Sequence, residues 1–136
     1  MQTVENTFTE SKVKFKYITH SLDKIAKAKS QTDDENIFIY LIDRSFSLNN
    51  IILDKQTNDF LTSNNFSQIH IYNKNVCDSS EKQYQTYSFE TTDGVILQYD
   101  KCLRLAPKFQ GLSFENNRAI FRRVDTNWII YIEKAF

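Results

Sequence analysis

The chain has 136 residues, of which 40% are hydrophobic and 25% charged, and its formal net charge is zero. A chain of this length and composition can bury a continuous core without disulfides or a structural metal, so we expect one globular domain over residues 1–136. Its 2 glycines and 1 proline leave few positions for phosphate-binding loops or nucleophile elbows, and we therefore expect neither.

The N-terminal residues and the cysteines bear on the compartment. Residues 1–6 are polar and no long apolar run follows them, so we expect neither a signal peptide nor a spanning helix, and a cytoplasmic location. Cys77 and Cys102 are far apart in the sequence. In a reducing compartment such a pair is typical of buried thiols, and we expect no disulfide. The abundance of Asn, Lys and Ile indicates a microbial source.

An amphipathic helix is predicted near the N-terminus. The segment Thr7-Phe8-Thr9-Glu10 matches the capping box, in which a hydroxyl and a carboxylate bind the free N–H groups of a helix start. Apolar residues then recur at steps of three and four between flanking lysines, namely Phe8, Phe15, Ile18, Leu22 and Ile25. This spacing predicts one helix of five to six turns, taking about 3.6 residues per turn. A strand around Phe15 is the alternative, but it is too short to explain the pattern.

Two local rules disagree in the next segment. Residues 32–35 form a second capping-box match, which favours a helix. The β-branched and aromatic run of residues 37–42 favours a strand that is covered on both faces, and we prefer the strand. Between Ser47 and Leu61 the apolar residues are scattered around a helical wheel, and we expect a second helix there.

The C-terminal half is rich in strand patterns. Residues 68–72 alternate, and two β-rich segments, 84–90 and 95–103, flank the turn sequence Thr92-Asp93-Gly94. A second hairpin is predicted from residues 118–124 and 128–133, joined through residues 125–127. The chain therefore predicts an α+β fold, in which an N-terminal amphipathic helix packs on a mostly antiparallel sheet of hairpins.

One short motif carries metal-ligand chemistry. Asp43, Ser45 and Ser47 form a D-x-S-x-S pattern after an apolar strand. It resembles the metal-ion-dependent adhesion site of von Willebrand factor A domains, and the resemblance implies that these three oxygens bind Mg²⁺ on a doubly wound sheet. The hairpins of the second half do not match such a sheet. We therefore expect Ser45 or Ser47 to cap a helix or turn, and no metal or other cofactor.

No local motif indicates catalysis. His20 and His70 are the only histidines, and neither has a nucleophile placed beside it by a known spacing. We expect His20 at the surface of the lysine-rich helix and His70 as a hydrogen-bonded structural residue of a strand. The chain is therefore not expected to be an enzyme, although a site built from residues distant in sequence would leave no local pattern.

Charge is distributed unevenly along the chain. Residues 1–32 carry +3, residues 33–100 carry −7 and residues 101–136 carry +4. Clustered charge can steer a complementary partner, unless folding interleaves the segments into an evenly mixed surface. The candidate partner-binding residues form an acidic set that could occupy a basic site on another protein: Asp33, Asp34, Glu35, Asp54 and Asp59.

These observations favour a small protein-binding module. Its size, its acidic middle and the absence of catalytic motifs are typical of a bacterial immunity or antitoxin protein that blocks the active site of a cationic toxin domain. We expect no membrane partner, and the oligomeric state stays open.

Two other function classes remain. The early helix and the meander ending in residues 128–132 resemble the cone-shaped NTF2-like fold, which implies a small-molecule-binding protein or an enzyme with a deep apolar pocket. A nucleic-acid-binding domain is the third class, and the neutral net charge makes it the weaker one. It would use interleaved basic and aromatic residues: Lys101, Arg104, Lys108, Arg118, Arg122 and Arg123 with Tyr99, Phe121 and Trp128.

Overall fold

A computed structural model describes residues 2–29, 36–42, 45–48, 51–74, 84–100, 113–115 and 118–133. The helices are α1 (Gln2–Glu10), α2 (Lys12–Lys29) and α3 (Lys55–Ser63). The strands are β1 (Asn36–Ile42), β2 (Ser45–Leu48), β3 (Ile51–Ile52), β4 (Phe66–Lys74), β5 (Tyr84–Thr91), β6 (Val95–Asp100), β7 (Ser113–Glu115), β8 (Ala119–Asp125) and β9 (Trp128–Glu133).

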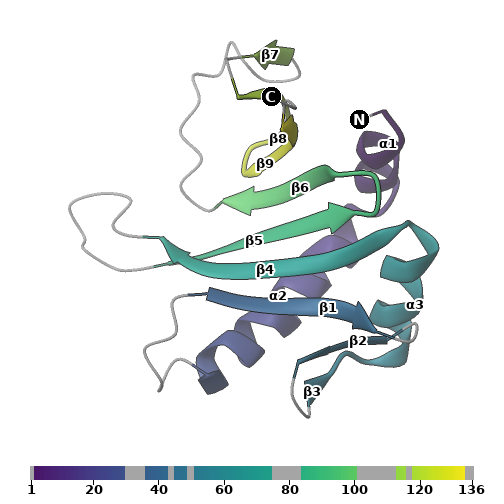
Figure 1. Ribbon diagram of the computed structural model, residues 1–136, viewed down its shortest axis with the longest axis vertical. Helices are drawn as coiled ribbons and strands as arrows, with labels where there is room; N and C mark the ends of the chain where they lie inside the picture. Colours follow the sequence, from purple (N-terminus) through teal and green to yellow (C-terminus); the bar gives the residue numbers. More distant parts are fainter. Residues whose placement is uncertain are drawn as a thin grey trace.

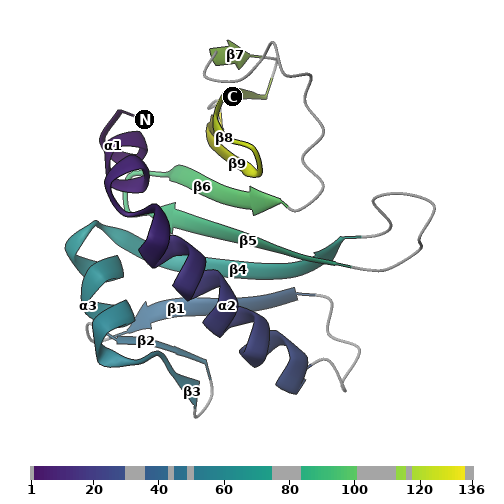
Figure 2. The ribbon, with the colours of Figure 1, turned by 180° about the vertical axis from the view of Figure 1, so that it is seen from behind.

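The strands form one sheet in the order β3-β2-β1-β4-β5-β6-β9-β8-β7, and every neighbouring pair is antiparallel. The helices all lie on one side of this sheet, and α2 runs diagonally across it (Figures 1 and 2). This arrangement confirms the α+β fold class. None of the described helices is long and apolar enough to cross a membrane.

The core lies between the helices and the sheet, and Phe15 of α2 is at its centre. The Phe15 side chain is fully buried, and its ring centroid lies between 5.4 and 6.0 Å from those of five other rings. These rings belong to Phe8, Phe60, Phe66, Phe89 and Trp128. The predicted packing of this helix on the sheet is thus confirmed, because Phe15, Ile18 and Leu22 are all buried in the core.

The start of that helix was predicted wrongly. Thr7 does not cap a helix, because α1 begins at Gln2 and the Thr7 hydroxyl donates to the Thr3 carbonyl within it at 3.0 Å. Val4, one turn before Phe8, is buried and extends the apolar stripe toward the N-terminus. The helical path is interrupted at Ser11, so one long predicted helix is two helices.

The segment around β1 confirms one prediction and corrects another. Residues 36–42 form a strand, as the apolar run favoured. The prediction that both faces of this strand are covered is wrong: Ile37 and Ile39 are buried, whereas Phe38 is 37% and Tyr40 48% exposed. The helices cover one face of the sheet only, and alternate residues of β1 point to the other.

The helix expected between Ser47 and Leu61 is correct only in its second half. Residues 45–48 and 51–52 pair as the strands β2 and β3, and the helix begins at Lys55. Its N-cap is Asp54, whose carboxylate accepts a hydrogen bond from the Thr57 backbone N–H at 3.1 Å. The apolar residues between Ser47 and Leu61 are scattered on a helical wheel because the segment is strand in its first half and helix in its second.

Both predicted hairpins are confirmed within the described residues. β5 and β6 are joined by residues 92–94, and the Gly94 N–H donates to the Thr91 carbonyl at 3.1 Å. Gly94 has φ of 86°, the left-handed conformation that closes a three-residue hairpin loop and that glycine adopts without strain. β8 and β9 pair around the turn at residues 126–127. Residues 101–103, predicted to extend β6, lie outside the described residues.

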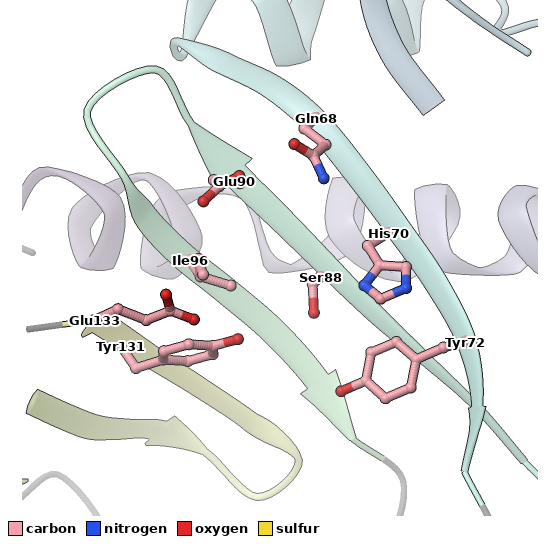
Figure 3. A pocket seen from close by; sticks show the side chains of 8 residues that line it. All are labelled: Gln68, His70, Tyr72, Ser88, Glu90, Ile96, Tyr131 and Glu133. Atoms are coloured by element: carbon pink, nitrogen blue, oxygen red, sulfur yellow. The ribbon is translucent and has the colours of Figure 1, made fainter. Parts of the chain in front are cut away.

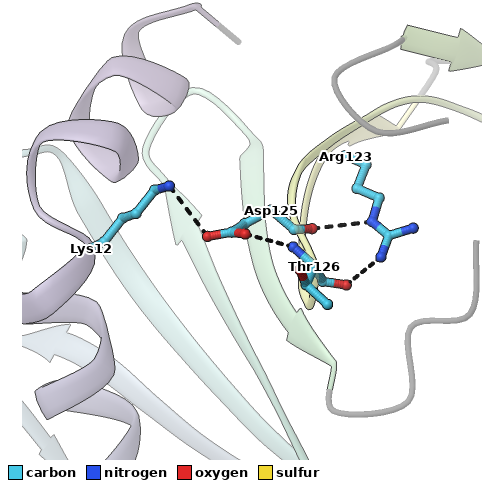
Figure 4. Close-up of polar contacts among 4 residues, drawn as sticks. All are labelled: Lys12, Arg123, Asp125 and Thr126. Carbon is cyan, nitrogen blue, oxygen red and sulfur yellow. Dashed lines mark hydrogen bonds and ion pairs between the residues drawn. The ribbon is translucent and has the colours of Figure 1, made fainter. Parts of the chain in front are cut away.

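Ion pairs connect the N-terminal helices to the far end of the sheet. The Arg122 guanidinium of β8 pairs with Glu5 of α1 at 2.8 Å. At the start of α2, the Lys12 ammonium lies 3.3 Å from the Asp125 carboxylate, beside the β8–β9 turn (Figure 4). These two ion pairs connect the first helices of the chain to the C-terminal hairpin β8–β9.

Candidate functional site

The face of the sheet turned away from the helices, which we call the open face because no described helix covers it, carries aromatic side chains. On β4, Ile69 and Ile71 are buried in the core, so His70 and Tyr72 point to the open face. Phe38 of β1 lies directly opposite His70, and their rings stack with centroids 4.1 Å apart at an interplanar angle of 9°. Open faces of antiparallel sheets usually carry polar residues, so this composition calls for an explanation.

Four rings form a continuous strip, which we call the aromatic row: Phe38, Tyr40, His70 and Tyr72. Tyr40 continues the stack from Phe38 at 6.0 Å, and Tyr72 continues it from His70 at 4.7 Å. Rings stacked on neighbouring strands stabilise the sheet. Because Phe38 and Tyr40 remain exposed, they also offer apolar area to a partner.

A hollow of about 330 Å³ adjoins the aromatic row on the same face (Figure 3). Its centre is one cross-strand line of residues, in which Gln68 of β4 pairs with Glu90 of β5, Glu90 with Ile96 of β6, and Ile96 with Tyr131 of β9. Glu133, two residues after Tyr131, also borders the hollow. The antiparallel register thus brings together side chains that are far apart in the sequence.

The hollow has an acidic side and an imidazole side. Glu90, Glu133 and Tyr131 lie together, and His70 and Tyr72 lie across from them (Figure 3). Burial, with smaller contributions from the nearby Tyr72, Glu133 and Glu90, raises the pKa of the Tyr131 hydroxyl to about 12. Burial lowers the pKa of His70 below its ordinary value. Burial thus favours the neutral forms of Tyr131 and His70, and these two groups share the hollow with the acidic side chains of Glu90 and Glu133.

The acidic set proposed from the sequence occupies another part of the molecule. Asp33, Asp34 and Glu35 lie outside the described residues. Asp54, the N-cap of α3, and Asp59 of α3 are exposed on the helical side of the sheet. Both Asp54 carboxylate oxygens bind Thr57, at 3.1 Å to its backbone N–H and 2.8 Å to its hydroxyl, which is a structural role. Those two acids are thus separated from the aromatic row.

A second hollow, of about 590 Å³, lies between α2 and α3 and includes Asp59. Lys14 and Tyr17 of α2 line its other side, and the Lys14 ammonium lies 4.9 Å from the centroid of the Phe60 ring. Both charge signs are therefore present in this second hollow. It offers less charge selectivity than the hollow on the open face of the sheet.

The D-x-S-x-S motif does not have the surroundings that its resemblance implies. The sheet is antiparallel rather than doubly wound, and Ser45 and Ser47 both lie in the strand β2 rather than at the start of a described helix. Asp43 lies outside the described residues, as do Cys77 and Cys102. Among the residues that are described, no group of three or more His, Cys, Asp and Glu could hold a metal ion.

The residues proposed for nucleic-acid binding are engaged within the fold where the structure describes them. Trp128 is buried against Phe8 and Phe15 in the core, with Tyr99 beside it, so neither ring is placed to stack on bases. Arg123 is 6% exposed and donates to the backbone carbonyls of Asp125 and Thr126 (Figure 4). Lys101, Arg104 and Lys108 lie outside the described part of the chain.

Most residues of the open face were missed by the sequence analysis. Residues 68–72 were predicted as a strand by their alternation and residues 128–133 as one arm of a hairpin, but the aromatic side chains at their outward positions, His70, Tyr72 and Tyr131, were not recognised as a surface. Aromatic residues at the positions that should face water are the signal that could have identified this surface. Comparison of the chain with protein-family models, with curated proteins and with solved structures finds no match.

Proposed function

We propose that this chain is a small protein-binding module of the immunity or antitoxin kind, which uses the open face of its sheet to cover the active site of a cationic toxin domain. The observation that carries the proposal is the aromatic row, with Phe38 37% and Tyr40 48% exposed on a face that no described helix covers. Exposed apolar patches mark interaction sites, and aromatic residues are enriched in protein interfaces.

The charge of the same face supports a cationic partner. Glu90 and Glu133 lie beside the aromatic row, and the nearest imidazole, His70, has a lowered pKa. An apolar strip bordered by carboxylates matches a basic surface such as that of a domain acting on nucleic acid, because complementary charge raises the association rate and excludes wrong partners. Asp54 and Asp59 lie on the helical side of the sheet, so in this proposal they are not part of the contact.

The proposal is tested by co-expression and pull-down with the product of the neighbouring gene. The wild-type chain is expected to form a complex at micromolar concentration and to relieve the toxicity of that product. A double variant, Phe38→Ser with Tyr40→Ser, should lose both properties while its circular dichroism spectrum remains that of a folded chain. Absence of any complex and of any rescue by the wild type contradicts the proposal.

The matched control for this experiment is Val13→Ser. Val13 is 82% exposed on α2, on the opposite side of the sheet, so the change removes a comparable exposed apolar group outside the proposed interface. It should leave complex formation and rescue unchanged. Equal loss of binding in Val13→Ser and in the double variant would assign the contact to the helices instead.

A small-molecule-binding protein related in shape to the NTF2-like fold is the second candidate. Its support is that His70 shares one hollow with two carboxylates, an arrangement that could hold a polar ligand. The space between α2 and the sheet is filled by the rings around Phe15, so the ligand would have to bind on the open face. Native mass spectrometry of the purified chain tests this, because a retained small molecule would favour it over protein binding.

A further inference from the structure

We infer that the hollow beside the aromatic row receives an arginine side chain of the protein partner, held between the carboxylates of Glu90 and Glu133 and the rings of Tyr72 and Tyr131. This inference rests on the proposed function and names the contact at its centre. A guanidinium group forms forked hydrogen bonds with carboxylates and stacks on aromatic rings, and this site offers both kinds of group.

The carboxylates are available for such a contact. Glu90 is half-buried and Glu133 exposed, and in the described part of the chain no hydrogen bond or ion pair engages either carboxylate. On β8, Arg122 pairs with Glu5 on the helical side of the sheet, and Arg123 donates to the backbone carbonyls of Asp125 and Thr126. The hollow therefore has two negative charges that no described cation neutralises.

The floor and walls of the hollow suit a flat cation. Ser88 and Ile96 are buried at its base, and the hydroxyl groups of Tyr72 and Tyr131 point inward from opposite sides (Figure 3). A volume of about 330 Å³ is at the lower end of the range for ligand sites, which suits one side chain rather than a cofactor. A charged group enclosed by rings is also partly shielded from water, which strengthens its attraction to the carboxylates.

The test uses two peptides that differ by one group. Acetyl-Gly-Arg-Gly-amide and its citrulline counterpart have almost the same shape, but citrulline is uncharged. Titration of the full chain, followed by amide chemical shifts, is expected to give saturable shifts at Glu90, Ile96 and Tyr131 with the arginine peptide, at a dissociation constant of about 1 mM. The citrulline peptide should bind at least about tenfold more weakly. Equal binding of the two peptides overturns the inference.

Variants assign the contact to the two carboxylates. Glu90→Gln and Glu133→Gln should each weaken arginine-peptide binding by about tenfold, since a hydrogen bond to a charged group is lost from a partly shielded site. Glu10→Gln is the control, because it changes the net charge equally at an exposed position of α1, on the other side of the sheet. Equal weakening by Glu10→Gln would mean that only net charge matters, and would overturn the assignment.

Agmatine, the decarboxylated form of arginine, distinguishes a site for a protein side chain from a site for a small ligand. Binding of agmatine about tenfold tighter than that of the peptide would make the hollow a small-molecule site and overturn the assignment to a partner's side chain. The two proposals can fail separately. Peptide binding without toxin rescue removes the proposed function and keeps the arginine site, whereas rescue that survives Glu90→Gln and Glu133→Gln removes the arginine site and keeps the function.

Discussion

His70 is the residue at which the stacked rings and the hollow meet. Its imidazole lies parallel to the Phe38 ring on one side and against Tyr72 on the other, and burial disfavours its charged form. A protonated imidazole at this position would bring a positive charge into a site that we propose to accept an arginine. The neutral state is therefore the one that suits binding.

The pKa of His70 is expected to lie below 6.5 in the folded chain. Because the unfolded chain then binds more protons, the free energy of unfolding should decrease as the pH falls through 6.5 toward the folded-state pKa, and this contribution should vanish in His70→Gln. The measurement is an NMR titration of the imidazole in a His20→Gln background, where one histidine remains. A folded-state pKa at or above 6.5 would contradict the stated effect of burial.

At the scale of single elements, the sequence predicts whether a segment is a helix or a strand better than it predicts the residue at which the element begins or ends. β4 was recognised by its alternating residues, β5 and β6 by their β-rich composition around Asp93-Gly94, and β8 and β9 by the turn residues between them. The N-terminal helix was recognised by its apolar spacing, but Thr7-Phe8-Thr9-Glu10 fits a capping box and still lies inside α1. A capping pattern marks a position at which a helix is able to begin. This helix begins earlier, because burial of Val4 in the core stabilises one more helical turn before Phe8.

At the start of α3 the error is the opposite one, since a true capping residue was not recognised as a cap. Asp54 was selected from the sequence as an acidic contact residue, yet its carboxylate holds the first turn of the helix through Thr57. The apolar residues before Asp54 belong to strands and those after it to a helix. No single apolar period therefore runs through the segment, and the start of the helix could not be located from the sequence.

Substitution at Asp54 can separate the structural role from the charge. Asp54→Ala removes the cap and should lower the free energy of unfolding by about 1 kcal/mol, whereas Asp54→Asn keeps a good N-cap and should have little effect. Urea unfolding followed by circular dichroism measures both. If Asp54→Asn weakens partner binding and Asp54→Ala weakens it no further, the charge of Asp54 takes part in recognition. Equal stability of Asp54→Ala and wild type would contradict the capping role.

At the scale of the whole molecule, the sequence predicted the layers but not which sheet face stays open. The run of residues 37–42 is apolar on both faces, which is typical of a fully covered strand, and only the position of the helices on one side reveals Phe38 and Tyr40 as surface residues. The hollow could not be predicted either. Its residues come from β4, β5, β6 and β9, and they meet only through the register of four antiparallel strands.

That open face depends on the core behind it, and Phe15 is the residue that joins the helical layer to the sheet. Phe15→Ala should lower the free energy of unfolding by about 3–5 kcal/mol, since it leaves a cavity among five rings that have little room to collapse. Val13→Ala, on the exposed side of the same helix, should change it by less than about 0.5 kcal/mol. Urea unfolding of the three chains measures the difference. A loss of under about 1 kcal/mol in Phe15→Ala would contradict a rigid core, and the sheet would then lack the support that fixes Glu90, Tyr131 and the aromatic row in place.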